Sequence, residues 1–179
     1  CRVAPCFWRP SRWGGRSTLA SAATQRGKLV AGSLSMNPEE PVSSSAILSI
    51  CIPTRNRVDT LLSALATALE LGDDIEVVVL DTGDEEGAQD RILCEFGSDP
   101  RIRYSYSPEP LSFAQAFDAA VALAQGEYVT IIGDDDGILP SALVHARWAL
   151  ANGIDAVTPT LPVSYNWPNF RHRYYGASD

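Results

Sequence analysis

The chain has 179 residues, of which 45% are hydrophobic, so it is long and apolar enough to fold as one domain with a buried core. This excludes disordered and collagen-like chains, and no apolar run reaches the ~18 residues that cross a bilayer. Residues 36–179 hold eight basic and 22 acidic residues, a net charge of −14 that excludes nonspecific nucleic-acid binding by this part of the chain.

The first 35 residues differ in composition from everything that follows. They include six basic residues, no acidic residue and no periodic apolar pattern. The chain begins with Cys1, its only methionine is Met36, and a secretory signal would need an apolar stretch that is absent here. We interpret this segment as upstream sequence before a start at Met36, and we expect residues 1–45 to form a disordered leader.

The cysteines show no zinc-site spacing with each other or with histidine. Cys51 lies in an apolar strand-like run and Cys94 in a helix-like one, so we expect both to be reduced thiols in the core. Reduced thiols indicate a reducing compartment, and we therefore expect a cytoplasmic protein, with peripheral membrane association left open.

The first half of the folded part alternates between strand and helix patterns. Residues 47–52 are predicted as a strand, and a helix begins at Asp59 and ends at Gly72. A second strand over residues 75–80 is rich in β-branched residues, and a second helix follows over residues 84–96. Residues 101–106 alternate as a third strand would.

The second half continues the alternation. Ser112 is predicted to cap a third helix that ends at Gly126, and a strand follows over residues 128–132. Ser141 is predicted to cap a fourth helix, and residues 154–158 to form a last strand. The residues of the third helix expected to face inward are Phe113, Ala116, Phe117, Ala120, Val121 and Ala124. The alternation predicts an α/β sandwich with a mostly parallel sheet over residues 46–160.

Polar side chains follow three of these strands, where ligands collect in such sheets. The most informative cluster is Gly133-Asp134-Asp135-Asp136-Gly137, because adjacent carboxylates repel one another unless water or a cation screens them. In an extended segment Asp134 and Asp136 would point the same way, and carboxylate oxygens suit Mg²⁺ or Mn²⁺. The alternative is a solvated acidic turn between a strand and a helix.

The other two strand ends carry one acid and two arginines. Asp81 could accept hydrogen bonds from a base or ribose, or it could be a turn residue before Gly83. Arg55 and Arg57 could pair with a diphosphate, or they could be ordinary surface arginines. The convergence of all three strand ends favours a nucleotide site.

Three segments in order resemble the family 2 glycosyltransferases of the GT-A fold: residues 48–57 (LSICIPTRNR), 76–84 (EVVVLDTGD) and 126–143 (GEYVTIIGDDDGILPSAL). The resemblance implies a GT-A, Rossmann-like three-layer sandwich. It also implies a hexosyltransferase in polysaccharide biosynthesis that moves a sugar from a nucleotide-diphosphate sugar to a glycan or lipid-linked acceptor. The helix after Ser112 departs from the family pattern, with Phe117 and Asp118 where an Arg and an Asn are common.

The resemblance also assigns roles to residues. The nucleotide-binding residues that it implies are Pro53, Thr54, Arg55, Arg57, Asp81, Asp134 and Asp135. Asp134 and Asp136 would form the Asp-x-Asp motif that holds Mn²⁺ or Mg²⁺ on the diphosphate, with Asp136 as the first choice of direct ligand.

An inverting transferase needs a carboxylate base, and after Asp136 the only acids are Asp155 and Asp179. We expect the base to lie beyond Asp179, and residues 161–179 to begin a truncated acceptor region. Two alternatives are a nucleotidyltransferase, which should have a Gly-rich phosphate loop after its first strand, and a noncatalytic nucleotide-binding fragment.

Overall fold

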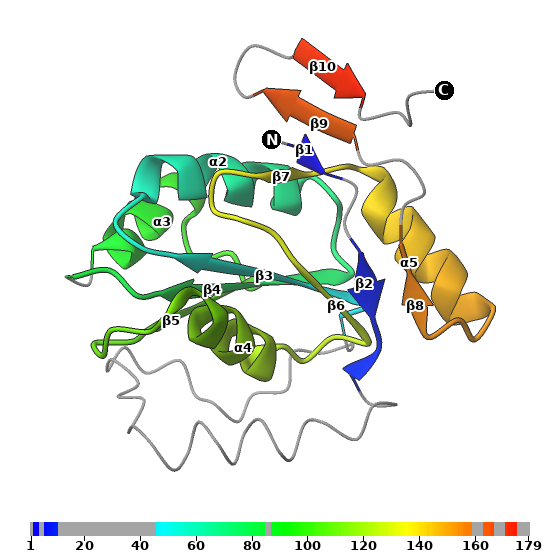
Figure 1. The fold of residues 1–179 in the computed structure, drawn as a ribbon, viewed down its shortest axis with the longest axis horizontal. Coiled ribbons are helices and arrows are strands. Elements are labelled where there is room, and N and C mark those ends of the chain that lie inside the picture. Colours follow the sequence, from blue (N-terminus) through cyan, green and yellow to red (C-terminus); the bar gives the residue numbers. More distant parts are fainter. Residues whose placement is uncertain are drawn as a thin grey trace.

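The computed structural model describes residues 2–3, 6–10, 46–84, 87–158, 163–166 and 171–174. A twisted central sheet has helices on both of its faces (Figure 1). The strands of this sheet are β2 (Phe7–Trp8), β3 (Leu48–Thr54), β4 (Ile75–Asp81), β5 (Ile102–Tyr106), β6 (Tyr128–Ile131) and β8 (Ala156–Val157). Their spatial order is β5-β4-β3-β6-β2-β8, and this confirms the α/β class.

The parallel part of the sheet comprises β5, β4, β3 and β6, and β2 runs antiparallel to both of its neighbours. Every residue of β3 and β4 is buried, as expected for parallel strands covered on both faces. Two further pairs lie outside this sheet: β1 (Arg2–Val3) with β7 (Gly137–Ile138), in parallel, and β9 (Val163–Asn166) with β10 (Arg171–Tyr174), antiparallel.

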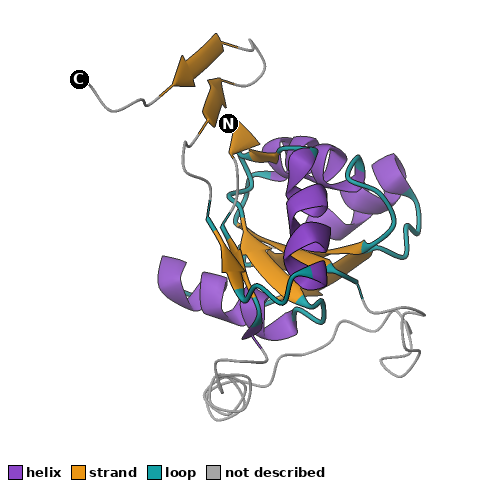
Figure 2. Cartoon of the chain, turned by 90° about the vertical axis from the view of Figure 1, so that its right-hand side faces the viewer, coloured by secondary structure: helices purple, strands orange, loops and turns teal. Residues whose placement is uncertain are grey.

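The helices in the described part of the chain are α2 (Val58–Leu69), α3 (Ala88–Phe96), α4 (Phe113–Leu123) and α5 (Ser141–Ala151). In Figure 1 α2 and α3 lie above the sheet and α4 lies below it, and Figure 2 shows the helices flanking the strands. Side chains of β3 alternate accordingly between the two faces of the sheet. Ile50 and Ile52 belong to the core between the sheet and α2, and Cys51 belongs to the core between the sheet and α4. None of these helices is long and apolar enough to cross a membrane.

A buried carboxylate connects the amino-terminal ends of the parallel strands. Glu76 on β4 accepts hydrogen bonds from the Ser49 hydroxyl at 2.5 Å and the Gly126 amide at 2.9 Å. Arg103 donates to the same carboxylate at 3.2 Å. A Cβ at Gly126 would lie 3.0 Å from the Ser49 amide nitrogen, so only glycine fits this turn before β6 without a shift of the backbone.

The predicted helices and strands are all present, with shifted ends. Ser112 caps α4 through a reciprocal pair of hydrogen bonds with Gln115, as predicted. Ser141 was wrongly predicted as a cap, because Pro140 takes the N-cap position of α5 and makes no side-chain cap bond. Cys51 is buried, whereas Cys94 is exposed on α3 and was wrongly placed in the core.

Residues 6–10 do not fit the interpretation of residues 1–45 as a disordered leader. Phe7 is 2% exposed and packs edge-on against Tyr128, with ring centroids 5.4 Å apart. The Arg9 guanidinium lies 5.2 Å from the centroid of the Tyr128 ring and donates to Glu127 at 3.2 Å. Residues 6–10 are held in place because the Phe7 ring is buried and β2 is paired with its neighbours. Residues 11–45 lie outside the described residues.

Candidate functional site

A cavity of about 560 Å³ opens at the carboxyl ends of β3 and β6. The chain leaves β3 toward β4 on one side, while β6 lies on the other side, so this is the point where the strand order reverses. Open α/β sheets bind ligands at such a point, because the diverging connections leave a crevice there. The volume is within the range of small-molecule and cofactor sites.

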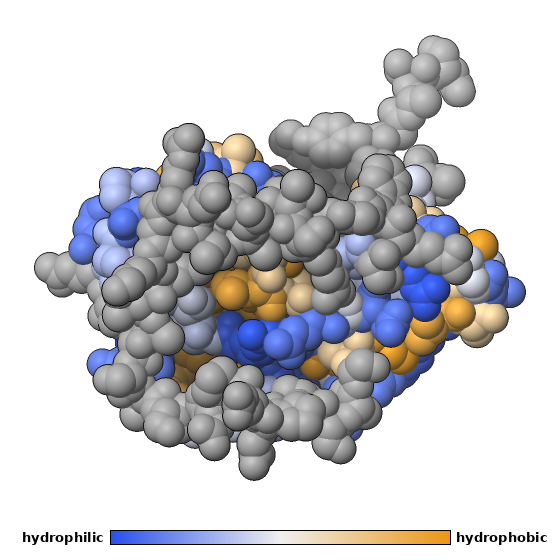
Figure 3. Space-filling view, turned by 90° about the horizontal axis from the view of Figure 1, so that it is seen from below, coloured by the Kyte–Doolittle hydropathy of each residue, from blue (hydrophilic) through white to orange (hydrophobic). Residues whose placement is uncertain are grey.

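The walls of the cavity differ in chemistry. The polar wall is formed by Thr54, Arg55, Arg57 and Thr82, with Pro53 beside them, and by the turn of Gly133, Asp134, Asp135 and Asp136. The apolar wall is formed by Leu111, Phe113, Ala116, Phe117, Ile131 and Ile132. Figure 3, seen from the side on which α4 lies in Figure 1, shows hydrophilic and apolar surface next to each other between the grey segments.

The three aspartates lie in a turn, where an extended segment was predicted. The amide of Asp136 donates to the Gly133 carbonyl at 3.1 Å, which closes the turn. Period-two alternation does not apply within a turn, so it gives no reason for Asp134 and Asp136 to share one face.

Asp134 points into the protein and is only 1% exposed. Its carboxylate accepts a 2.7 Å hydrogen bond from the Thr54 hydroxyl and a 3.1 Å hydrogen bond from Nε of Arg57. Arg57 also forms an ion pair with the second oxygen of Asp134. A buried carboxylate requires this kind of compensation, so Asp134 joins the ends of β3 and β6.

Asp135 and Asp136 converge above Gly133. A Cβ built on Gly133 would lie 2.8 Å from Oδ1 of Asp135 and 3.1 Å from Oδ2 of Asp136. Arg57 reaches the other oxygen of Asp135 at 3.3 Å. Glycine at position 133 thus leaves free the space beside which the ends of both carboxylates lie.

The donor set suits a hard divalent cation. Mg²⁺ is often held by one or two carboxylates and completed by water and substrate phosphates. Across the described residues, no three or more His, Cys, Asp or Glu side chains gather into a metal site. Two convergent carboxylates fit an ion that takes its remaining ligands from solvent and substrate, and Asp135 with Asp136 fits this description better than the predicted pair with Asp134.

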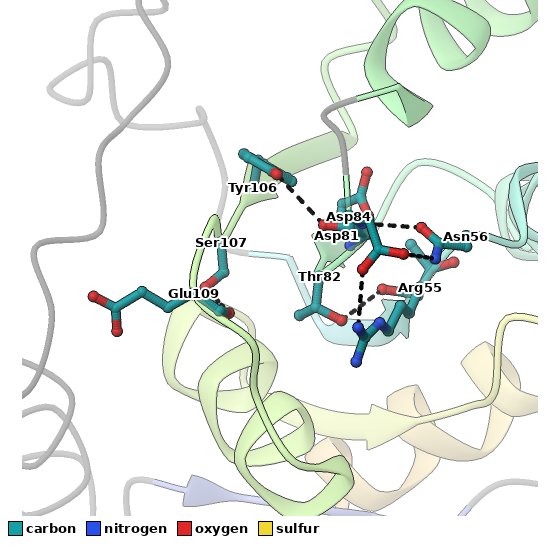
Figure 4. A network of polar contacts seen from close by, with 10 residues as sticks. Arg55, Asn56, Asp81, Thr82, Asp84, Tyr106, Ser107 and Glu109 are labelled. Atoms are coloured by element: carbon teal, nitrogen blue, oxygen red, sulfur yellow. Dashed lines mark hydrogen bonds and ion pairs between the residues drawn. The ribbon is translucent and has the colours of Figure 1, made fainter.

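A second polar network holds the loop after β3 (Figure 4). Asp84 accepts hydrogen bonds from Arg55 at 2.9 Å and from the Asn56 amide group at 2.7 Å, and its own backbone amide donates to Asn56 at 3.0 Å. The hydrogen bond from Arg55, followed by that from Asn56, lowers the pKa of Asp84 below its usual value. Asn56 has φ 56°, a backbone conformation that this network supports.

Asp81 is not among the cavity-lining residues, although the sequence grouped it with them. It is 3% exposed, and its two oxygens accept from the Gly83 amide and the Tyr104 hydroxyl, each at 2.8 Å. The neighbouring Thr82 lines the cavity and donates its hydroxyl to the Thr54 carbonyl at 3.0 Å. Contact of Asp81 with a base or ribose stays a prediction.

The apolar wall was missed because its residues were assigned to the core. Phe113 is 78% exposed, and its ring lies 4.3 Å from that of Phe117. Helical periodicity predicts which residues share a face, but it does not predict whether that face is covered, and Phe113, Ala114 and Gln115 in the first turn of α4 are all exposed. The position of Phe113 directly after the cap residue was the available signal.

Sequence comparison identifies the family. The sequence profile described as glycosyl transferase family 2 matches residues 49–176, most of the chain. The putative colanic acid biosynthesis glycosyl transferase WcaA of Escherichia coli K12 is 29% identical over 103 residues, which are 57% of this chain and 37% of WcaA. The abequosyltransferase RfbV of Salmonella typhimurium LT2 is 30% identical over 101 residues, which are 54% of this chain and 30% of RfbV.

The chain therefore spans about a third of the length of these two relatives. Among solved structures, the mannosyltransferase PcManGT from Pyrobaculum calidifontis, in complex with GDP-Man and Mn²⁺, has a TM-score of 0.47 and 22% identity. The match covers 58% of this chain and 31% of PcManGT.

Proposed function

This chain belongs to glycosyl transferase family 2, and we propose that its cavity binds the nucleotide-diphosphate end of a sugar donor whose sugar is transferred to an acceptor hydroxyl. The observation that carries the proposal is the position of two arginines and two convergent carboxylates in one cavity at the strand-order reversal. These groups match the charges of a diphosphate and of a cation bound to it.

Arg55 and Arg57 supply the positive charge for the diphosphate. Their side chains are 51% and 55% exposed, so their guanidinium groups are accessible from the cavity. Each also contacts an aspartate, which holds its guanidinium at the rim. Planar guanidinium groups donate two parallel hydrogen bonds to phosphate oxygens, which favours this role over that of a diffuse surface charge.

Asp135 and Asp136 would hold Mn²⁺ or Mg²⁺, and Asp134 would keep the turn in place through Thr54 and Arg57. When bound, such an ion neutralises the negative charge that develops on the departing nucleoside diphosphate. Metal dependence and an inverting course are part of the proposal. Its inverting part is checked by the anomeric configuration of the product.

The acceptor is proposed to be a glycan or a lipid-linked sugar. The protein is proposed to act in the cytoplasm. The name of WcaA supports a glycan acceptor, because it refers to colanic acid biosynthesis, whereas the name of RfbV states only the sugar that is transferred, abequose. The net charge of residues 36–179 argues against nonspecific nucleic-acid binding by this part of the chain.

Thermal unfolding with and without ligand tests the donor site. A ligand that binds only the folded state at 100 times its Kd adds about 2.7 kcal/mol of stability, so the melting temperature should rise by several degrees with UDP, GDP or TDP plus Mn²⁺. Asp135→Asn with Asp136→Asn should abolish the metal-dependent part of the rise, while Asp73→Asn, an exposed acid outside the cavity, should preserve it. The absence of a rise with all three nucleotides would contradict the proposal.

A further inference from the structure

Phe113 is an unusual residue to find exposed at the rim of a cavity. Its side chain is 78% exposed, the highest value among the large apolar side chains in the described part of the chain that are solvent-exposed. Exposed aromatic rings are unfavourable in water, and a ligand that covers one gains apolar contact. The other exposed apolar residues, such as Val144 and Trp148 on α5, lie outside the cavity.

The ring of Phe113 is held in place by its surroundings. Phe117, one helical turn later, packs against it with an interplanar angle of 38°. The helix end is fixed by the capping box, in which the Gln115 side chain accepts from the Ser112 amide at 2.9 Å. A fixed aromatic surface stacks a ligand at a lower entropic cost than a mobile one.

Charged side chains line the same cavity as Phe113. Arg57, Asp135 and Asp136 are polar and charged, and Phe113 and Phe117 present carbon only. A nucleoside diphosphate has the same division, because its diphosphate is charged and its base is a flat ring with an apolar face. Aromatic side chains stack with any base through this face.

We infer that Phe113, supported by Phe117, is the stacking surface for the nucleobase of the donor, and that it sets the affinity for the nucleoside part. This inference rests on the proposed donor site. It places the diphosphate at the acidic turn and the base over the first turn of α4, and it leaves the sugar without a contact on Phe113.

Calorimetric titration in Mn²⁺ separates the base from the diphosphate. Phe113→Ala should weaken binding of UDP, GDP and TDP by about 5- to 30-fold, the range expected for loss of one stacked base at a partly open site. Binding of inorganic pyrophosphate with Mn²⁺ should change less than about twofold, because it has no base to stack. Phe113→Tyr should restore nucleotide affinity.

Val144→Ala is the matched control, since Val144 is 60% exposed on α5 and does not line the cavity. Alanine is a good helix former and Phe113 is exposed, so Phe113→Ala should fold normally, as its circular dichroism and melting temperature will verify. The inference is overturned if Phe113→Ala weakens pyrophosphate and nucleotides equally, or if it leaves nucleotide binding unchanged. It is also overturned if the loss is seen only with a nucleotide sugar, which would place the sugar on the ring. If the unmodified protein binds none of the three nucleotides, the proposed function fails, and this inference fails with it.

Discussion

The Thr54 hydroxyl donates a 2.7 Å hydrogen bond to the Asp134 carboxylate and so joins the end of β3 to the turn after β6. Both residues are buried, and they are 80 positions apart in the sequence. The same carboxylate is paired with Arg57, which ties the loop after β3 to the acidic turn after β6 within the polar wall of the cavity. The shape of the proposed donor site therefore depends on this contact.

Removal of the Thr54 hydroxyl should cost stability. Thr54→Val keeps the shape of the side chain but leaves the buried Asp134 with one donor fewer, which should lower the free energy of unfolding by about 1–2 kcal/mol. Urea denaturation measures the change. Thr60→Val is the matched control, because the Thr60 hydroxyl is exposed, and it should change stability by less than about 0.5 kcal/mol. Equal losses of unfolding free energy in the two variants would show that the buried Thr54–Asp134 contact does not stabilise the fold more than an exposed one.

A side chain at Gly133 should displace the two carboxylates that converge there. In Gly133→Ala the new Cβ would lie 2.8 Å from Asp135 and 3.1 Å from Asp136, at the mobile ends of both side chains. We expect them to rotate away, so that the affinity for Mn²⁺ in the presence of UDP, GDP or TDP falls about tenfold or more while the melting temperature without ligand changes little. Titration with Mn²⁺, followed by paramagnetic broadening, measures this affinity.

Gly126→Ala provides the contrast, because its Cβ would meet the Ser49 hydroxyl oxygen at 2.6 Å and backbone atoms at 3.0 and 3.1 Å. Backbone cannot rotate away, so this variant should lose about 1–3 kcal/mol of stability. A loss of the same size in Gly133→Ala would contradict the assignment of Gly133 to the site.

Asp99 and Arg101 should make stability depend on pH in the acid range. Arg101 donates to Asp99 at 2.7 Å and to the Leu69 and Gly72 carbonyls at 2.9 and 3.0 Å, where it satisfies the end of α2. The hydrogen bond from Arg101 lowers the pKa of Asp99 below its usual 3.8, although partial burial acts in the opposite direction. A carboxyl whose pKa is lower in the folded state stabilises the fold above its unfolded pKa and loses that contribution as the pH falls through the folded value.

Asp99→Asn should therefore be less stable than the unmodified protein at pH 7, and the difference should shrink as the pH falls below about 4. Urea denaturation at a series of pH values measures it. Asp59→Asn removes the partner of Arg91 in a surface ion pair whose aspartate is 87% exposed, and it should have little effect at any pH. A difference for Asp99→Asn that persists unchanged to pH 3 would contradict the role of its charge.

The parts of the fold that could be predicted are those with long apolar patterns. The parallel strands β3 and β4 are buried over seven residues each, which is enough to give a continuous apolar run, and α2 has a regular apolar face. Strands β2 and β7 have two residues each, and no periodicity can be detected over such a length. They form because partners distant in the sequence supply their hydrogen bonds.

The candidate site was predictable in its location and partly in its geometry. Arg57 and the three aspartates could be placed together because each follows the end of a predicted strand, and parallel strands end at one edge of the sheet. The direction of each carboxylate was not predictable, since the turn closed by Gly133 and Asp136 and the pairing of Asp134 with Thr54 are tertiary contacts. The exposure of Phe113 was not predictable for the same reason, since it depends on which elements pack against the first turn of α4.

Phe7 offers the sharpest test of the amino-terminal strand. It is 2% exposed, it contacts Tyr128, and β2 lies between β6 and β8 and pairs with both. Truncation of a buried phenylalanine leaves a cavity, so Phe7→Ala should lower the free energy of unfolding by about 3–5 kcal/mol, as measured by urea denaturation. Phe113→Ala makes the same chemical change at a 78% exposed position and should lower it by less than about 0.5 kcal/mol. If Phe7→Ala were as mild as Phe113→Ala, residues 6–10 would add nothing to the folded domain, and the interpretation of this segment as a dispensable leader would stand.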